Sequence, residues 1–183
     1  MAIVIPYVKQ TWTDGSGGGT PVSAARLGVL EEGILDVSQA PAVGVTHNAN
    51  QSTTTGVDFV LAFNTERFDQ AGGASAAMHD TVTNNSRLTA VYAGVYQIVG
   101  NIQYAANGTG TRYIKIRLNG ATEIARVQLV AAASDTHTLN ITRQYVLAVN
   151  DYVELLALQS SGGALNVVAA GNYSPEFSMV RVA

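Results

Sequence analysis

The sequence predicts an all-β protein: a C-terminal jelly-roll sandwich of about eight to ten antiparallel strands, preceded by an extended arm and one short helix. Apolar and polar residues alternate from residue 43 onward, as in strands with one buried face. Turns rich in Gly and Asn interrupt this alternation at short intervals. The preceding residues instead hold a glycine run and a helical repeat. We therefore divide the chain into an arm (1–20), a helix with linker (21–42) and a jelly-roll domain (43–183).

The composition of the chain indicates an oligomer and argues against nucleic-acid binding and cysteine chemistry. Of 183 residues, 47% are hydrophobic and only 13% are charged, with a net charge of −3. So low a charge density predicts that part of the apolar surface is covered in an oligomer. The ten Lys and Arg are scattered, and without a basic stripe we expect no nucleic-acid binding. There is no cysteine, which excludes disulfides and thiolate metal sites.

Membrane insertion and secretion are also not expected. No apolar run reaches the roughly 20 residues that a transmembrane helix needs. The opening residues lack the basic segment of a signal peptide, and Pro6 interrupts their apolar run. We therefore expect synthesis in a host cytoplasm, without membrane insertion.

The arm has the composition of a docking segment. An apolar stretch leads into Trp12 and then into the glycine run 17–19. The stretch is too short to fold alone, so its ordering has to come from a partner. The predicted docking residues are Ile3, Ile5, Tyr7 and Trp12.

A short amphipathic helix is predicted over residues 21–38. Pro21 suits a helix start, and Ser23 suits an N-cap. The apolar positions follow the 3-4-3 spacing of a coiled-coil seam. This seam comprises Leu27, Leu30, Ile34 and Val37. Two heptads are too few to associate alone, so the helix either packs on its own domain or belongs to a short trimeric bundle.

Strands in the C-terminal domain are indicated by period-two alternation. The predicted segments are 57–63, 96–104, 113–118, 139–147, 153–158 and 177–180. Asn119-Gly120 predicts a type I′ hairpin turn. The segment 153–158 is apolar on both faces, which predicts a strand buried on both sides. We assign Val153, Leu155, Leu156 and Leu158 to trimer or core contacts.

Catalytic patterns were sought, and none is found in the sequence. His47, His79 and His137 stand alone, without metal-ligand spacing. The chain has no nucleophile elbow, and its carboxylates are dispersed. These observations predict a protein that is not an enzyme and that needs no cofactor.

Calcium is the one metal that the sequence leaves open. Hard oxygen ligands, such as carboxylates and carbonyls, suit this ion. The candidate ligands in predicted loops are Asp69, Asp80 and Asp135. No Asp-x-Asp pattern groups them.

Four motifs occur in a suggestive order along residues 45–183. They are Ala93-Gly94-Val95-Tyr96, Leu118-Asn119-Gly120, Leu147 to Val153, and Pro175 to Met179. In this order they resemble the globular head of complement C-one-q, a tumour-necrosis-factor-like jelly roll. Asn150 stands where that family has glycine. The resemblance implies a homotrimer around an apolar axis.

The N-terminal motifs resemble the opening of bacteriophage fibre and appendage proteins. They are Trp12-Thr13-Asp14-Gly15, Thr20-Pro21-Val22-Ser23-Ala24 and Glu31-Glu32-Gly33-Ile34. Together with the jelly roll, this resemblance implies a structural protein at the virion surface whose arm binds another virion protein.

Three functions follow as hypotheses. The first is a head fibre or capsid decoration protein, docked on the major capsid protein. The second is a receptor-binding fibre on a tail or baseplate protein that recognises a host-surface glycan. The third, a depolymerase, is disfavoured because glycan cleavage needs paired carboxylates in a groove. Two heptads span only about 20 Å, and the chain has no longer shaft, which favours the capsid.

Overall fold

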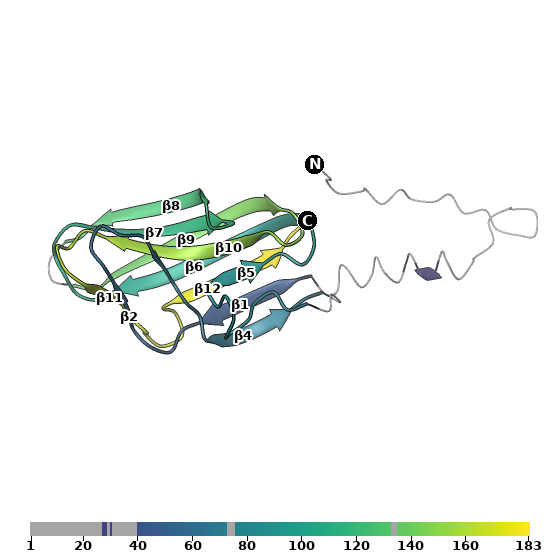
Figure 1. Cartoon of the computed structure of the whole chain (residues 1–183), viewed down its shortest axis with the longest axis horizontal. Coiled ribbons are helices and arrows are strands. Elements are labelled where there is room, and N and C mark those ends of the chain that lie inside the picture. The colour runs from purple at the N-terminus through teal and green to yellow at the C-terminus, as the bar shows by residue number, and fades with distance from the viewer. Residues whose placement is uncertain (1–26, 29, 31–39, 73–75, 133–134) are drawn as a thin grey trace, which may run out of the picture.

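The structure is a computed structural model that describes residues 27–28, 30, 40–72, 76–132 and 135–183. The described residues form twelve strands in two antiparallel sheets that face each other (Figure 1), which confirms the predicted all-β sandwich. Leu27, Gly28 and Leu30 have helical backbone. The rest of the predicted helix and the whole arm lie outside the described residues. Six assigned residues are therefore not described, namely Ile3, Ile5, Tyr7, Trp12, Ile34 and Val37.

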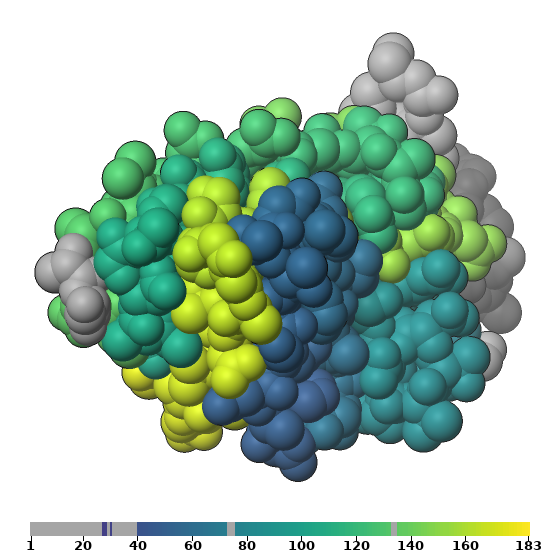
Figure 2. Space-filling view, turned by 60° about the vertical axis from the view of Figure 1, so that its left-hand side comes forward, coloured from purple at the N-terminus to yellow at the C-terminus, as the bar shows by residue number. Residues whose placement is uncertain are grey.

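The first sheet has seven strands in the order β2-β11-β6-β12-β1-β4, with β9 on the other side of β6. They are β1 (Ala42–Thr46), β2 (Gln51–Thr53), β4 (Thr65–Gln70), β6 (Gly94–Tyr104), β9 (His137–Leu147), β11 (Leu165–Val167) and β12 (Glu176–Arg181). Figure 2 shows the segment containing β11, in yellow, beside the segment containing β2, in blue.

The second sheet has five strands built around β10. They are β3 (Phe59–Val60), β5 (Arg87–Thr89), β7 (Thr111–Leu118), β8 (Thr122–Val130) and β10 (Tyr152–Gln159). β10 pairs with β3, β5 and β7, and β8 continues the sheet beyond β7. No helix among the described residues has the length and apolar character needed to cross a membrane.

The strand count exceeds the expected eight to ten because the chain includes four pieces of two or three residues, β2, β3, β5 and β11. The predicted strand 57–63 shortens to Phe59–Val60. Leu61 and Phe63 still point into the core. Between them, Ala62 uses its backbone N–H and C=O to bind the side-chain amide of Gln51, so this segment has no strand partner there.

Two turns use the left-handed backbone region. Asn119 and Gly120 have φ values of 50° and 70°, which confirms the type I′ hairpin between β7 and β8. Asn150, which stands in place of a glycine, has a φ of 69°. Asparagine tolerates this conformation better than other residues with a Cβ, so the substitution preserves the turn.

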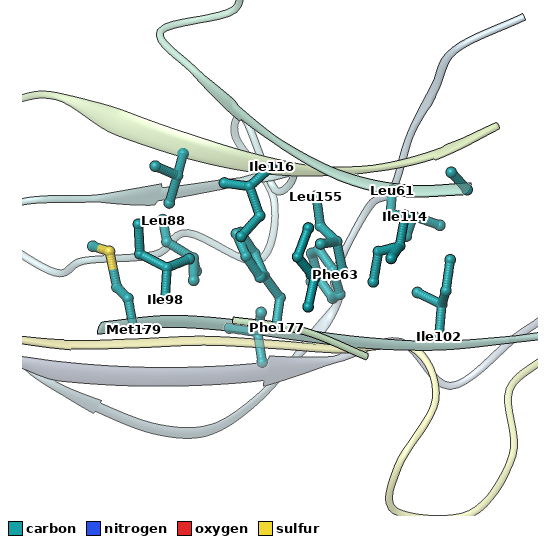
Figure 3. Packing of buried hydrophobic residues seen from close by; sticks show 14 of the residues in the cluster. Leu61, Phe63, Leu88, Ile98, Ile102, Ile114, Ile116, Leu155, Phe177 and Met179 are labelled. Carbon is teal, nitrogen blue, oxygen red and sulfur yellow. The ribbon is translucent and has the colours of Figure 1, made fainter. Parts of the chain in front are cut away.

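Apolar side chains from both sheets fill the space between them (Figure 3). Ile98, Phe177 and Met179 come from the first sheet, and Ile116 and Leu155 come from the second. Phe177 also stacks on the ring of Phe63, with 5.8 Å between ring centroids. The described core is therefore one hydrophobic layer that lies between the two sheets and holds them together.

Gly100 sets how closely the two sheets approach at the centre of β6. A Cβ at this position would lie 2.4 Å from Leu155 Cδ1 and 3.2 Å from Ile141 Cγ2. We expect Gly100→Val to lower the free energy of unfolding by about 1–3 kcal/mol, because overpacking forces side chains or backbone to shift. Denaturant unfolding at fixed protein concentration measures this. Gly163→Ala, where a Cβ meets nothing within 4 Å, is the control. An unchanged midpoint for Gly100→Val would contradict the close approach.

Tyr104 links the two sheets through its buried hydroxyl. The hydroxyl oxygen lies 2.9 Å from the carbonyl oxygen of Tyr113 and 3.0 Å from that of Leu158. Burial raises the pKa of Tyr104 above its ordinary value of 10.0. As pH rises past about 10, the unfolded chain loses this proton while the folded chain keeps it. The contribution of Tyr104 to stability is therefore fully present below that pH and is lost above it.

We expect the free energy of unfolding to fall more steeply above pH 10 in the wild type than in Tyr104→Phe. The difference in slope should approach about 1.4 kcal/mol per pH unit. At pH 7 the variant should be less stable by about 1 kcal/mol, because it lacks the hydrogen bond. Urea unfolding at a series of pH values measures both effects. Parallel stability curves above pH 10 would show that Tyr104 ionises normally in the fold.

Candidate functional site

Across β6, β9 and β12, the outward face of the first sheet holds mostly uncharged side chains. In β6, β9 and β12, alternate side chains enter the core, and the others point outward. These outward side chains, which we call the neutral face, are Val95, Gln97, Val99, Asn101 and Gln103 of β6, Thr138, Asn140, Thr142, Gln144 and Val146 of β9, and Ser178 and Val180 of β12. Glu176 of β12 also points outward, in register with Asn101 of β6, and is the charged exception among the described residues of these strands; its Oε1 lies 3.7 Å from Arg67 Nε.

The outward face of the second sheet has the opposite character. Glu154 is buried, and its Oε2 accepts hydrogen bonds from Arg117 Nε at 3.1 Å and Nη2 at 2.9 Å. Further along the sheet, Lys115 Nζ lies 2.7 Å from Asp58 Oδ1 and 3.5 Å from Glu123 Oε2. Ionic groups are costly to bury against a partner unless they are matched. This charged face is therefore suited to solvent, and the neutral face is suited to contact.

At one side of the sandwich, β8 and β9 lie close to each other without pairing, so each keeps an unpaired hydrogen-bonding edge within the described chain. Apolar side chains of β8 are exposed there, with exposed fractions of 39% for Val127 and 42% for Leu129. Val146 of β9, on the neutral face, is 60% exposed. Arg143, between Thr142 and Gln144, is exposed and alternates with the neutral-face residues of β9. This open edge, defined by β8 and β9, borders the neutral face. Unpaired strand edges and exposed apolar groups are typical of contact surfaces.

The doubly apolar strand predicted over 153–158 is β10, and it is buried within a single chain. Val153 and Leu155 enter the core between the sheets. Leu156 lies on the other side of the strand, 2% exposed, in register with Val60 and Lys115. Leu158 is partly exposed. Packing within the chain therefore accounts for the apolar character of this strand, and its role in a trimer stays a prediction.

Two residues of the predicted helix seam are described, and both are exposed, Leu27 by 48% and Leu30 by 38%. The neutral face was not predicted from the sequence, although its signal was present there. Every outward position from Gln97 to Gln103, and from Thr138 to Gln144, holds an uncharged residue. An outward face left to solvent usually carries charges.

The histidines are engaged separately. His79 Nδ1 lies 2.9 Å from Glu66 Oε1, and its Nε2 lies 3.2 Å from the carbonyl oxygen of Asn85, so both ring nitrogens have a partner. His137 Nε2 accepts a hydrogen bond from the backbone N–H of Ala132. His47 contacts its own loop at Ala49. No two of the three histidines share a site in these contacts.

The three aspartates considered for calcium bind backbone N–H groups. Asp69 accepts from Met78 and His79, Asp80 accepts from Val82 and Thr83, and Asp135 accepts from Thr136. Hydrogen bonds from the backbone of Thr83 and Val82 lower the pKa of Asp80. Within residues 40–72, 76–132 and 135–183, His, Asp and Glu side chains form no group of three or more that could hold a metal ion.

Several solved structures have the same fold. Murine APRIL is 7% identical, with a TM-score of 0.58, and the match covers 78% of this chain and 99% of that chain. The Eiger tumour necrosis factor from S. frugiperda is 12% identical, with a TM-score of 0.56 and coverages of 79% and 94%. The globular domain of zebrafish complement 1qA is 14% identical, with a TM-score of 0.54 and coverages of 79% and 98%.

These similarities confirm the jelly-roll fold of the tumour-necrosis-factor and complement-head type. At such low identity they show the fold alone. No protein-family model matches the chain, and no curated protein matches it. The bacteriophage resemblance of the N-terminal motifs stays a prediction.

A variant of Leu156 can distinguish packing within the chain from contact between copies. We expect Leu156→Ala to lower the free energy of unfolding by about 2–5 kcal/mol, because it leaves a cavity between β3, β10 and β7. The loss should be the same at low and high protein concentration. Denaturant titration at two concentrations about a hundredfold apart measures this. A loss that appears only under conditions of association would place Leu156 at an interface instead.

Proposed function

We propose that this protein is a non-enzymatic structural protein of a bacteriophage virion. Its jelly-roll domains form a homotrimer, its N-terminal arms dock on the capsid, and the domains are displayed outward as a decoration or short head fibre. The neutral face is the observation that supports the proposed trimer. The virion assignment rests on the N-terminal motifs, Trp12 to Gly15 and Thr20 to Ile34.

The neutral face suits burial between copies because it requires little desolvation of charge. A hollow of about 410 Å³, lined by Val95, Gln144, Tyr145 and Val146, lies at one end of it and can receive side chains from a neighbour. The open edge offers Val127 and Leu129 to such a neighbour. Packing the edge of one copy on the face of the next is a heterologous contact, which closes into a ring when the rotation allows. The complement-head resemblance favours closure at three.

The path of the chain supports docking from one end. Ala42 is in register with Val180, and the N–H of Arg181 donates to the carbonyl oxygen of Pro41. The C-terminus and the start of β1 therefore lie at the same end of the sandwich (Figure 1). In a ring of three, all three chains would enter at that end. The glycine run supplies slack for three arms, which would then bind with avidity.

The trimer is tested by a charge placed on the neutral face. We expect the full-length wild type to have three times the mass of one chain in sedimentation equilibrium. Thr142→Arg should shift it toward monomer, because it buries an unpaired charge. Val57→Arg, a 55% exposed residue in the connection before β3, at the edge of the second sheet away from β8, is the matched control and should stay trimeric. A monomeric wild type, or dissociation in both variants alike, would rule out the neutral face as the trimer contact.

Docking is tested by deleting residues 1–20. The truncated protein should remain a soluble trimer but should no longer join virions, because the predicted anchors Ile3, Ile5, Tyr7 and Trp12 are gone. Each such aromatic or apolar anchor can contribute about 2 kcal/mol. Immunoblots of purified particles measure incorporation. Normal incorporation of the truncated chain would refute the docking role.

Attachment to the head or the tail is decided by a phage that lacks the whole gene. A capsid decoration protein predicts normal adsorption and near-normal plaque titre, with faster thermal inactivation. A tail receptor-binding fibre predicts normal thermal inactivation and adsorption reduced by orders of magnitude. The second result would replace the capsid assignment with the tail assignment.

A further inference from the structure

A polar hollow of about 700 Å³ opens between β4, the β4–β5 connection, β5 and the start of β10. Its walls include Glu66 of β4, Arg87 and Thr89 of β5, and Asn150 and Tyr152 at the start of β10. This volume lies in the range of sites that take small organic ligands. The hollow is separate from the neutral face.

Hydrogen bonds hold the walls of the hollow in place. Asp69 accepts from the backbone N–H of Met78 at 2.9 Å and of His79 at 3.0 Å. The imidazole of His79, in the β4–β5 connection, hydrogen-bonds to the Glu66 carboxylate of β4 through Nδ1. Its Nε2 contacts the carbonyl oxygen of Asn85 in the same connection. His79 is thus a positioning residue whose buried ring fixes the wall. A site built in this way needs little reorganisation when a ligand binds.

The polar groups that face the hollow are not the ones whose hydrogen bonds hold its walls in place. Within the described residues, the side-chain amides of Asn84 and Asn150 and the hydroxyls of Thr83 and Thr89 make no hydrogen bond to the protein. Asn84 and Asn150 also have φ values of 54° and 69°, a conformation that costs energy for a residue with a side chain. Glycine would relieve that cost, yet an amide is present at both corners of the hollow.

Arg87 presents a guanidinium in a fixed plane. Its Cζ lies 4.1 Å from the centroid of the Tyr152 ring, and its Nε lies 3.6 Å from Glu154 Oε1. That Nε is buried and has no hydrogen-bond partner in the described chain. The terminal nitrogens of Arg87 donate no hydrogen bond to any described residue either. These nitrogens are therefore hydrogen-bond donors at the wall of the hollow that are available to a ligand.

The charges of the hollow disfavour an anionic ligand. Glu66 and Asp80 place two carboxylates in the walls, and Glu154 lies beside Arg87. A neutral ligand rich in hydroxyl groups matches the set better, because each hydroxyl both donates and accepts a hydrogen bond. Amide, guanidinium and carboxylate side chains can then bind neighbouring hydroxyls of one sugar ring.

We propose that this hollow binds a neutral saccharide, with Asn84, Asn150 and Arg87 as its recognition residues. The inference rests on the display function proposed above, in which the domain faces outward and can meet surface glycans. Each site would bind weakly, and three sites on one trimer would add avidity.

Saturation-transfer difference NMR on the full-length protein tests this site. The probes are the methyl glycosides of glucose, galactose, mannose and N-acetylglucosamine, with glucuronic acid and N-acetylneuraminic acid as the acidic set. The test variant is Asn84→Gly with Asn150→Gly, which removes both amides and keeps the left-handed turns. Val82→Ala, an 85% exposed position in the same connection but outside the walls, is the matched control. Arg87→Lys tests the planar donor, with folding checked by circular dichroism.

We expect at least one neutral glycoside to bind the wild type and Val82→Ala equally, and to bind the double glycine variant about tenfold or more weakly, a loss of about 1.4 kcal/mol. Binding by acidic sugars alone, by none of the probes, or with equal strength to the double variant would overturn the proposal. The assay uses protein in solution, so it does not depend on docking. If particles incorporate the protein but no sugar binds, the saccharide site fails and the structural function stands.

Discussion

The side chains of β6 and β10 that enter the core hold the two sheets together. Tyr96, Ile98 and Ile102 enter the core from β6, and Val153, Leu155 and Ala157 meet them from β10. Gly100 leaves room for Leu155 at the centre of this contact. Because side chains alternate along a strand, the core contacts of β6 and β9 fix which of their residues face outward. Filling the core therefore fixes the positions of the neutral face, and the sequence places mostly uncharged residues at those positions.

Charge is separated between the two outer faces of the sandwich. The second sheet carries the ion pairs of the buried Glu154 and Lys115, whose partners Arg117 and Asp58 are partly exposed to water. Over β6, β9 and β12, the first sheet carries mostly amides, hydroxyls and short apolar groups. With only 13% of residues charged, the chain has few charges to place, and their distribution distinguishes one face from the other. This asymmetry is why we assign the contact between copies to the first sheet.

Much of the fold could be predicted from the sequence because its signals are local. The alternation in 96–104 and 139–147 became β6 and β9, and Asn119-Gly120 became the expected hairpin turn. β8 was not predicted, although a hairpin turn requires a returning strand and residues 122–130 are rich in β-formers. β4 was also not predicted, because it is a charged and exposed edge strand that lacks apolar alternation.

The candidate sites depend on contacts between distant segments and could not be read from spacing. The polar hollow joins Glu66 with Asn150, two residues far apart in the chain. The strand 153–158 misled the assignment of the trimer contact, because an apolar strand predicts burial without indicating whether its partner is the same chain or another.

The most direct test of the neutral face uses the absence of cysteine, which gives a clean background for single thiols. Thr142→Cys places one thiol on the neutral face of the full-length protein, and Val57→Cys places one in the exposed connection before β3, away from the open edge. The rate of labelling by a maleimide reports accessibility. We expect the thiol at position 142 to react about tenfold or more slowly than the thiol at position 57, and both to react equally after denaturation. Equal rates in the native protein would contradict burial of the neutral face between copies.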